Sequence, residues 1–214
     1  MNYLQQPRQI EQQSFEIIGD IIAREYPGYR FVDRMQEAII KRVIHTTADF
    51  DWLDVLWFSP TALERITAGL RAGCLLYTDT TMALSGINKT LLAQLGCECR
   101  CFISDPRVVA RANAENITRS MAAVDIALEE AGDKLFVFGN APTALFRLLE
   151  RSSEKRATPL AVIGVPVGFV GAAESKDALI HSDIPCIAAA GRKGGSNVAA
   201  AIVNAILYRI REER

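Results

Sequence analysis

From Cys74 onward, short apolar runs alternate with segments of helical pattern, and this alternation constrains the fold more than any other feature of the chain. We expect helices near 88–95, 105–131, 141–152, 173–181 and 196–211. The apolar runs between them read as strands: CLLYTD (74–79), CRCFIS (99–104), KLFVFG (134–139), LAVIGVP (160–166) and PCIAAAG (185–191). Such alternation predicts a mainly parallel sheet with helices on both faces. The expected fold is therefore a three-layer α/β/α arrangement with five strands in a doubly wound order.

The first 72 residues have a helical pattern instead of an alternating one. A helix is expected over 10–25, with Ser14 facing inward in the middle of its apolar stripe of Ile10, Ile17, Ile18, Ile21 and Ile22. Further helices are expected over 32–45 and 60–71. Because no internal repeat or linker interrupts the chain, we expect one domain over 1–214, with a helical part of about 1–72 and an α/β part of about 73–214.

Charge and cysteine usage narrow the classes of function. The chain has 24 basic and 25 acidic side chains and a net charge of −1. It lacks the basic surplus of duplex-binding proteins, so we expect no nucleic-acid partner. The number of cysteines is odd and three of them alternate in CECRC (97–101). No CxxC pair or nearby histidine completes a metal site there, so we interpret these thiols as reduced, buried core residues.

The chain has no feature of a membrane protein or of a secreted one. The uncharged stretch PLAVIGVPVGFVGAA (159–173) is broken by proline and glycine and is shorter than the roughly 20 residues of a membrane span. The opening MNYLQQPRQIEQQ lacks the basic and then apolar pattern of a signal peptide. We therefore expect a soluble cytoplasmic protein.

The strongest local signal is GRKGGSNVAAAIVNAI (191–206), in which a strand enters a glycine-rich turn and then a helix. The amides that begin such a helix point toward whatever binds there, and Arg192 and Lys193 add positive charge. This pattern predicts an anion site that includes Gly194 and Ser196. It has neither the Walker A spacing nor the GxGxxG spacing of a dinucleotide site. A tight turn carrying two solvated cations remains the alternative.

Two further turns connect a strand to a helix. In FGNAPTAL (138–145), Asn140 is a candidate cap and Pro142 suits the first helical turn. A helix start and a ligand contact are both open interpretations of that segment. In GVPVGFVGAAESK (164–176), the glycines favour close approach of the backbone to a flat, apolar partner.

His45, in RVIHTTADF (42–50), is one of only two histidines in the chain. Arg42 and His45 are three residues apart on the expected helix, so they are neighbours at the margin of its apolar stripe. An imidazole can exchange protons near neutral pH, but a lone histidine at such an edge can also be a cap or a packed residue. We interpret His181, at the end of an expected helix, as structural. The chain has no GxSxG or HExxH motif, so the commonest hydrolase classes do not apply.

Taken together, several segments resemble the precorrin-8X methylmutase family of cobalamin biosynthesis, in order from Ile10 to Ile206. The resemblance implies a flavodoxin-like α/β fold and a homodimer that binds its substrate near the subunit interface. It also implies an isomerase that moves one methyl group between adjacent ring carbons of a corrinoid, a C-11 to C-12 type shift, without a separate cofactor. The segments are IEQQSFEII (10–18), RVIHTTADF, TDTTMALSGINK (78–89), NITRS (116–120), FGNAPTAL, GVPVGFVGAAESKDAL and GRKGGSNVAAAIVNAI.

By this similarity, His45 matches the proton donor or acceptor of the family, and Ser14 and Arg42 match positions that contact the substrate. A corrinoid precursor is a flat macrocycle fringed with carboxylates, which guanidinium groups and helix N-termini bind well. On these physical grounds we assign Arg119, together with the 191–196 turn (Arg192, Lys193, Gly194 and Ser196), to substrate carboxylates.

The sequence leaves open whether the substrate is precorrin-8X or cobalt-precorrin-8, and so whether the product is hydrogenobyrinate or cobyrinate. The GRKGGS and HTTADF versions of these segments favour the cobalt-bearing route. Two other functions remain as alternatives. One is a non-catalytic flavodoxin-like module that binds a phosphate or nucleotide at the 191–196 turn. The other is a corrinoid carrier that holds the product and hands it to the next enzyme of the pathway.

Overall fold

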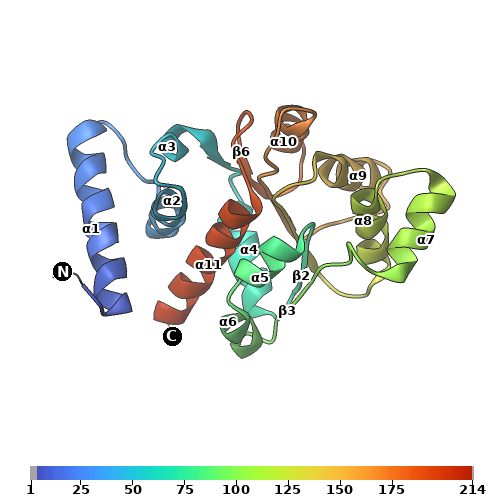
Figure 1. The fold of residues 1–214 in the computed structure, drawn as a ribbon, viewed down its shortest axis with the longest axis horizontal. Coiled ribbons are helices and arrows are strands. Elements are labelled where there is room, and N and C mark those ends of the chain that lie inside the picture. The colour runs from blue at the N-terminus through green and yellow to red at the C-terminus, as the bar shows by residue number, and fades with distance from the viewer. Residues whose placement is uncertain (1–3, 214) are drawn as a thin grey trace.

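A computed structural model describes residues 4–213, and its strands and helices alternate as the sequence predicts (Figure 1). Within these residues six strands form one sheet in the order β1-β6-β5-β4-β2-β3. The five parallel strands, numbered along the chain, follow the order 2-1-3-4-5, which is the flavodoxin-like doubly wound order. The fold class is confirmed. The strands are β1 (Leu56–Phe58), β2 (Leu75–Thr78), β3 (Glu98–Arg100), β4 (Lys134–Phe138), β5 (Ala161–Gly164) and β6 (Cys186–Ala189).

The expected number of five strands is wrong by one, because β1 adds an antiparallel edge to the sheet. Leu56 pairs with Ala189 and Phe58 with Ile187 of β6. β1 is only three residues long and lies between two helices, so it is too short to produce a recognisable alternation of apolar and polar residues. Its pairing is supplied by the backbone of β6.

The helices agree with the expected segments, except that two short helices (Trp52–Val55 and Thr81–Gly86) lie where none was expected and one expected helix is divided in two. The segment expected as one helix over 105–131 is two helices, because Asn116 takes a left-handed conformation (φ 52°) and Thr118 caps a new helix through the amide of Met121. The helices are α1 (Pro7–Glu25), α2 (Arg34–Thr47), α3 (Trp52–Val55), α4 (Ala62–Arg71), α5 (Thr81–Gly86), α6 (Lys89–Gln94), α7 (Pro106–Glu115), α8 (Arg119–Glu129), α9 (Pro142–Ser153), α10 (Ala172–Ile180) and α11 (Ser196–Glu212). Among the helices of residues 4–213, none combines the length and the apolar character needed to cross a membrane.

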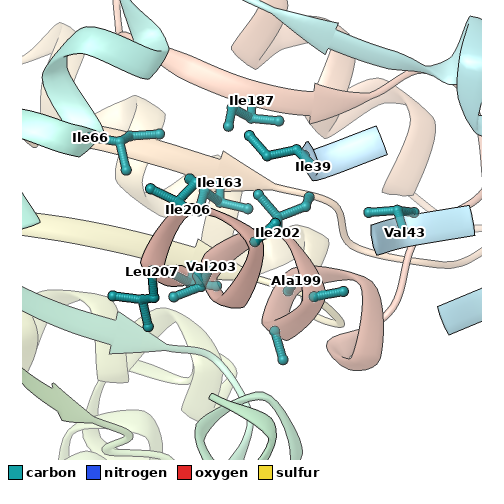
Figure 2. Close-up of a cluster of buried hydrophobic side chains, with 14 of the residues drawn as sticks. Ile39, Val43, Ile66, Ile163, Ile187, Ala199, Ile202, Val203, Ile206 and Leu207 are labelled. Atoms are coloured by element: carbon teal, nitrogen blue, oxygen red, sulfur yellow. The ribbon is translucent and has the colours of Figure 1, made fainter. Parts of the chain in front are cut away.

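Residues of each central strand alternate between two buried layers. Val137 and Ile163 face the layer that holds α2, α4 and α11, whereas Phe136 and Val162 face the layer of α8, α9 and α10. Figure 2 shows the first layer, where Ile202 and Ile206 of α11 lie among side chains of the strands and of α2 and α4. One cluster of buried side chains therefore includes residues from the helical N-terminal part and from the sheet.

α1 packs mainly on α2 and lies at one end of the molecule (Figure 1). Ile18 and Ile22 are buried against α2, but Ile10 and Ile17 are 45% and 50% exposed. The prediction that the whole isoleucine stripe faces the core is therefore wrong. Only the part of α1 that meets α2 is covered within this chain.

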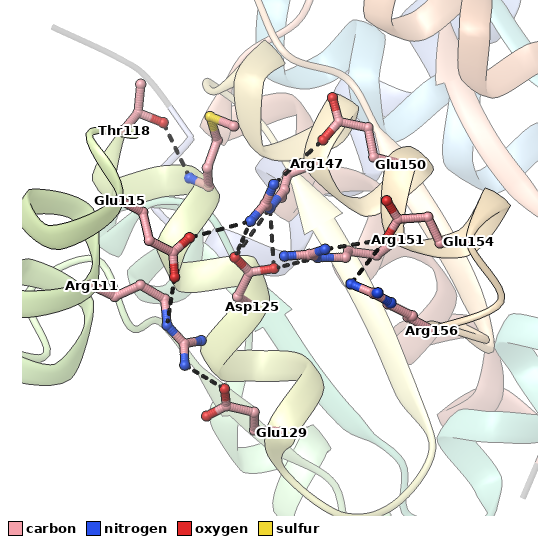
Figure 3. A network of polar contacts seen from close by, with 11 residues as sticks. Arg111, Glu115, Thr118, Asp125, Glu129, Arg147, Glu150, Arg151, Glu154 and Arg156 are labelled. Atoms are coloured by element: carbon pink, nitrogen blue, oxygen red, sulfur yellow. Dashed lines mark hydrogen bonds and ion pairs between the residues drawn. The ribbon is translucent and has the colours of Figure 1, made fainter.

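The outer helices α7, α8 and α9 are joined by a network of ion pairs (Figure 3). Its centre is Asp125 of α8, which is buried and accepts hydrogen bonds from Arg147 and Arg151 of α9 at 2.7–3.1 Å. Burial favours the protonated form of Asp125, but these two guanidinium groups outweigh it and lower the pKa of the carboxyl group. The network fixes α8 against α9 at the surface farthest from α1.

The three alternating cysteines have different surroundings. Cys97 is buried and its Sγ donates to the carbonyl oxygen of Leu70 at 3.1 Å. Cys99 is half-buried and packs against the same core, whereas Cys101 is half-buried outside it, so the prediction that all three are buried core residues holds fully for Cys97 alone.

Candidate active site

Ser14 of α1 and His45 of α2 are brought together although 31 residues separate them in the chain. The Oγ atom of Ser14 lies 2.7 Å from Nδ1 of His45. The ring of Phe15 stacks on the imidazole with 5.3 Å between centroids. Phe15 thus holds one face of the ring and Ser14 holds one edge. Because His45 is exposed to solvent, its Nε2 atom remains available to a ligand. This pair can orient a proton donor toward a molecule outside the chain.

Arg42 lies one helical turn before His45 on α2. Its guanidinium forms an ion pair with Glu11 of α1 and lies over the rings of Phe15 and Tyr208, at 4.7 and 4.9 Å from the two centroids. These contacts hold the side chain flat against α1 and α11. The structure thus places Ser14, Arg42 and His45 on one α1–α2 surface.

Lys193 connects that surface to the glycine-rich turn. Its Nζ lies 2.5 Å from Oδ2 of both Asp49 and Asp51, which follow α2 in the chain. These hydrogen bonds raise the pKa of Lys193, and the bond from Lys193 lowers the pKa of Asp49. Within this chain Lys193 is therefore already neutralised by two carboxylates, which the sequence did not indicate.

The turn at 191–196 is shaped by close backbone packing. A Cβ atom at Gly194 would lie 2.1 Å from the carbonyl oxygen of Val165, and the amide of Gly195 donates to that same oxygen at 2.9 Å. Ser196 is buried at the start of α11, and its Oγ lies 2.7 Å from Oγ1 of Thr80. Gly194 and Ser196 thus fix the turn against the carboxyl ends of β5 and β2.

Asp79 is a buried carboxylate near the glycine-rich turn that the sequence did not single out. Its buried carboxylate accepts hydrogen bonds from the amides of Gly139, Asn140 and Ala141 at 2.7–2.9 Å. Burial raises the pKa of Asp79, and the three amide donors oppose that effect. Its position at the end of the run 74–79, directly after β2, was the available signal, because ligands of doubly wound sheets collect where strands end.

This carboxylate changes the interpretation of the FGNAPTAL segment. Asn140 is not the cap of α9, because Ala141 holds the cap position and its amide is bonded to Asp79. The amides at the crossover between β2 and β4 are therefore occupied by the chain's own anion. A bound phosphate would have to displace a buried carboxylate there, which disfavours a nucleotide site in this loop.

Arg119 and Arg192 remain exposed. Arg119 begins α8, directly after Thr118, whose Oγ1 lies 3.2 Å from that of Thr143 at the start of α9. Arg192 lies 5.7 Å from the ring centroid of Phe169, which is itself 85% exposed. Both guanidinium groups are available to an anionic ligand at the edge of the sheet where the strands end.

Two cavities of about 590 and 370 Å³ lie between α1, α2 and α11. Arg42 and Tyr208 line both of them, whereas His45 lines neither. Across residues 4–213 no cluster of three or more histidine, cysteine, aspartate or glutamate side chains is arranged to hold a metal ion. Because His45 is exposed and lines neither of these cavities, its imidazole faces open solvent in the single chain.

Comparisons with known proteins identify the family to which the chain belongs. A family profile described as precorrin-8X methylmutase matches residues 9–209. The cobalt-precorrin-8 methylmutase of Salmonella typhimurium strain LT2 is 68% identical over 213 residues, covering 99% of this chain and all of that protein. The precorrin-8X methylmutase of a Sinorhizobium species is 35% identical and covers 96% of both chains.

A solved structure supports the same relationship. The crystal structure of precorrin-8X methyl mutase from Thermus thermophilus superimposes with a TM-score of 0.86 at 35% identity, covering 96% of this chain and 97% of that one. The resemblance seen in the sequence is confirmed by the family profile, the relatives and the fold. The chain belongs to the precorrin-8X methylmutase family.

Proposed function

We propose that this chain is an isomerase that moves one methyl group from C-11 to C-12 of cobalt-precorrin-8 and yields cobyrinate in cobalamin biosynthesis. The full-length identity of 68% to a cobalt-precorrin-8 methylmutase favours the cobalt-bearing substrate over precorrin-8X. The observation that carries the mechanism is the Ser14–His45 pair, because it is a proton donor held ready at an exposed surface. The methyl group leaves and arrives on one molecule, so no second substrate is required.

His45 is proposed to lend a proton to the macrocycle. When Ser14 donates its hydroxyl hydrogen to Nδ1, the neutral imidazole carries its own proton on Nε2, which points away from Ser14. Protonation of the conjugated ring favours the product's arrangement of double bonds, and general acid assistance typically contributes about 10²- to 10⁴-fold in rate. Substrate and product are isomers, so the proton returns to the enzyme.

The carboxylates of the substrate are proposed to meet Arg42, Arg119, Arg192 and the 191–196 turn, with Gly194 and Ser196 contributing backbone. The exposure of Arg119 and Arg192 supports their assignment. We also assign Lys193 to a substrate carboxylate, although it is already bonded to two aspartates. The side chain of Asp51, the more exposed of the two, is 67% exposed, so a substrate carboxylate can take its place.

We further propose that the active unit is a homodimer, in which a second chain covers the α1–α2 surface beside His45. Ile10 and Ile17 on α1 are half-exposed next to Ser14, and the imidazole lies outside the large cavities. A second copy would bury these isoleucines and exclude water from the imidazole. Sedimentation analysis of the purified protein tests this, since a monomer that turns over substrate would contradict it.

A cytoplasmic location and transfer of the product to the next pathway enzyme complete the proposal. All five cysteines are free, as in reducing compartments.

The deciding experiment mixes purified protein with a tetrapyrrole extract and looks for a coloured, tightly bound product, whose cobalt content separates the two substrates. Stopped-flow comparison of product release with chemistry then tests hand-over, because a carrier would release its product far more slowly than it forms it.

A further inference from the structure

Lys176 of α10 is a buried lysine that the proposed mechanism does not use. Its side chain is fully buried, and its Nζ donates to the carbonyl oxygen of Lys193 at 2.6 Å. That carbonyl belongs to the glycine-rich turn, directly before Gly194. The ammonium therefore reaches the turn from the interior, while the side chain of Lys193 extends away toward Asp49 and Asp51.

Within the part of the chain that the structure describes, Lys176 forms no ion pair with a carboxylate. α10 packs against α9 and β6. β6 carries no charged residue, and the loop before α10 (165–171) carries none either. The remaining charged groups on the surrounding elements are exposed or engaged elsewhere: Glu174 and Asp177 of α10, His181 and Asp183 before β6, Arg147, Glu150 and Arg151 of α9, and Arg192 and Lys193 of the turn.

A buried ammonium without a counter-ion is costly, and one carbonyl satisfies only one of its three donors. Buried titratable groups in such perturbing surroundings cluster at functional sites, and an anion beside the ammonium would favour its charged form. The nearest surface is the turn that we assign to substrate carboxylates. We propose that Lys176 is a positioning residue that holds the 191–196 turn by its Lys193 carbonyl and receives its missing counter-charge when a carboxylate of the corrinoid binds that turn. This inference rests on the proposed function.

The proton equilibrium of Lys176 makes the inference measurable. Burial lowers the pKa of Lys176 to about 8. A carboxylate at the turn favours the charged form, so binding raises this pKa and takes up a proton. Affinity is then greatest below pH 8 and falls as the lysine of the free enzyme loses its proton. If binding raises the pKa by about one unit, the charged enzyme binds about tenfold more tightly than the neutral one.

The test measures binding of purified cobyrinate by absorbance between pH 6.5 and 9.5. The wild-type dissociation constant is expected to rise about tenfold over this range, with uptake of about half a proton on binding at pH 8.5 in indicator solution. The Lys176→Met variant should bind at pH 7 as weakly as the wild type at pH 9.5 and show no pH dependence. Its KM should rise while its kcat stays near the wild-type value, because His45 is untouched.

Lys134→Met is the matched control, because Lys134 also donates to a main-chain carbonyl, that of Gly132 at 2.7 Å, but from the opposite end of the sheet. It should retain the wild-type pH profile. If Lys176→Met does not fold, Lys176→Gln takes its place. The uptake of a proton on binding is measured on the wild-type protein and so tests the inference without any variant. Tight cobyrinate binding without proton uptake, or a Lys176→Met protein with the wild-type profile, would overturn the inference alone. Absence of corrinoid binding by the wild type at every pH would overturn the proposed function as well.

Discussion

The hydroxyl oxygen of Ser14 lies 2.7 Å from Nδ1 of His45 and joins α1 to α2. This contact fixes the ring by its inner nitrogen and leaves the outer nitrogen for a ligand. Since neither residue is part of a local motif, the pair exists only because α1 packs along α2. The chemistry proposed here therefore depends on the docking of one helix.

Replacement of His45 tests the proton donor. We expect His45→Ala to abolish the spectral change of rearrangement but to retain most of the affinity for the corrinoid, since the guanidinium groups remain. His181→Ala is the control, because His181 closes α10 with Nδ1 2.9 Å from the carbonyl oxygen of Asp177. Turnover by His45→Ala at the wild-type rate would reject the assignment.

Replacement of Ser14 tests the orientation of the imidazole. A neutral hydrogen bond contributes about 1 kcal/mol, so Ser14→Ala should lower kcat about fivefold. The loss should fall on kcat and not on the affinity for the corrinoid, because the imidazole is no longer held in one orientation and tautomer. Stopped-flow absorbance at several pH values measures this effect, and an unchanged kcat throughout would assign Ser14 a purely structural role.

Gly194→Ala tests the shape of the turn. A Cβ atom there would lie 2.1 Å from the carbonyl oxygen of Val165, so the backbone must shift. We expect the folded variant to bind cobyrinate at least about tenfold more weakly, equivalent to about 1.4 kcal/mol. Gly28→Ala is the control, since a Cβ there meets nothing within 4 Å. Equal binding by both variants would show that the turn does not contact the ligand.

Asp125→Asn tests the network of Figure 3 as a source of stability. Removal of one partner from a buried ion pair costs about 3 kcal/mol or more in free energy of unfolding. Because the folded-state pKa of Asp125 is lowered, this stability is present above its unfolded pKa of about 3.9 and is lost as the pH falls through the lower folded value.

Urea denaturation of wild type and Asp125→Asn at pH 7 and pH 3.5 measures the difference, which should be large at pH 7 and smaller at pH 3.5. Glu150→Gln provides the comparison, because Glu150 is exposed and lies 3.6 Å from Arg147. That variant should lose less than about 1 kcal/mol. Equal losses in both variants would mean that the burial of Asp125 has no special effect.

Much of the fold was accessible from the sequence because its parallel strands are buried on both faces. Runs such as KLFVFG must then be apolar throughout, and helices must separate them. β1 escaped detection because three residues are too few to show an alternating pattern. Ile17 was assigned to the core because periodicity identifies an apolar face but not what covers it. The single-domain organisation stays a prediction, supported by the core cluster shared between both parts of the chain.

The candidate site was less predictable, since its contacts join distant segments. His45 drew attention through its rarity, and the family resemblance implied that Ser14 contacts the substrate, but neither predicted that the two side chains would meet. Nothing local shows that Lys193 would meet Asp49 and Asp51, or that Asp79 would occupy the amides of Gly139 to Ala141. Such pairings are set by the order of strands and helices in space, which a single sequence does not state.

The bonds between Lys193 and the two aspartates after α2 have a consequence for motion. They are the ion pairs that tie the segment following His45 to the loop leaving β6. A ligand that drew Lys193 away from either carboxylate would loosen this tether and change how freely the segment after α2 fluctuates. Arrival of an anion at the turn would then alter the motion of the neighbouring segment that follows His45.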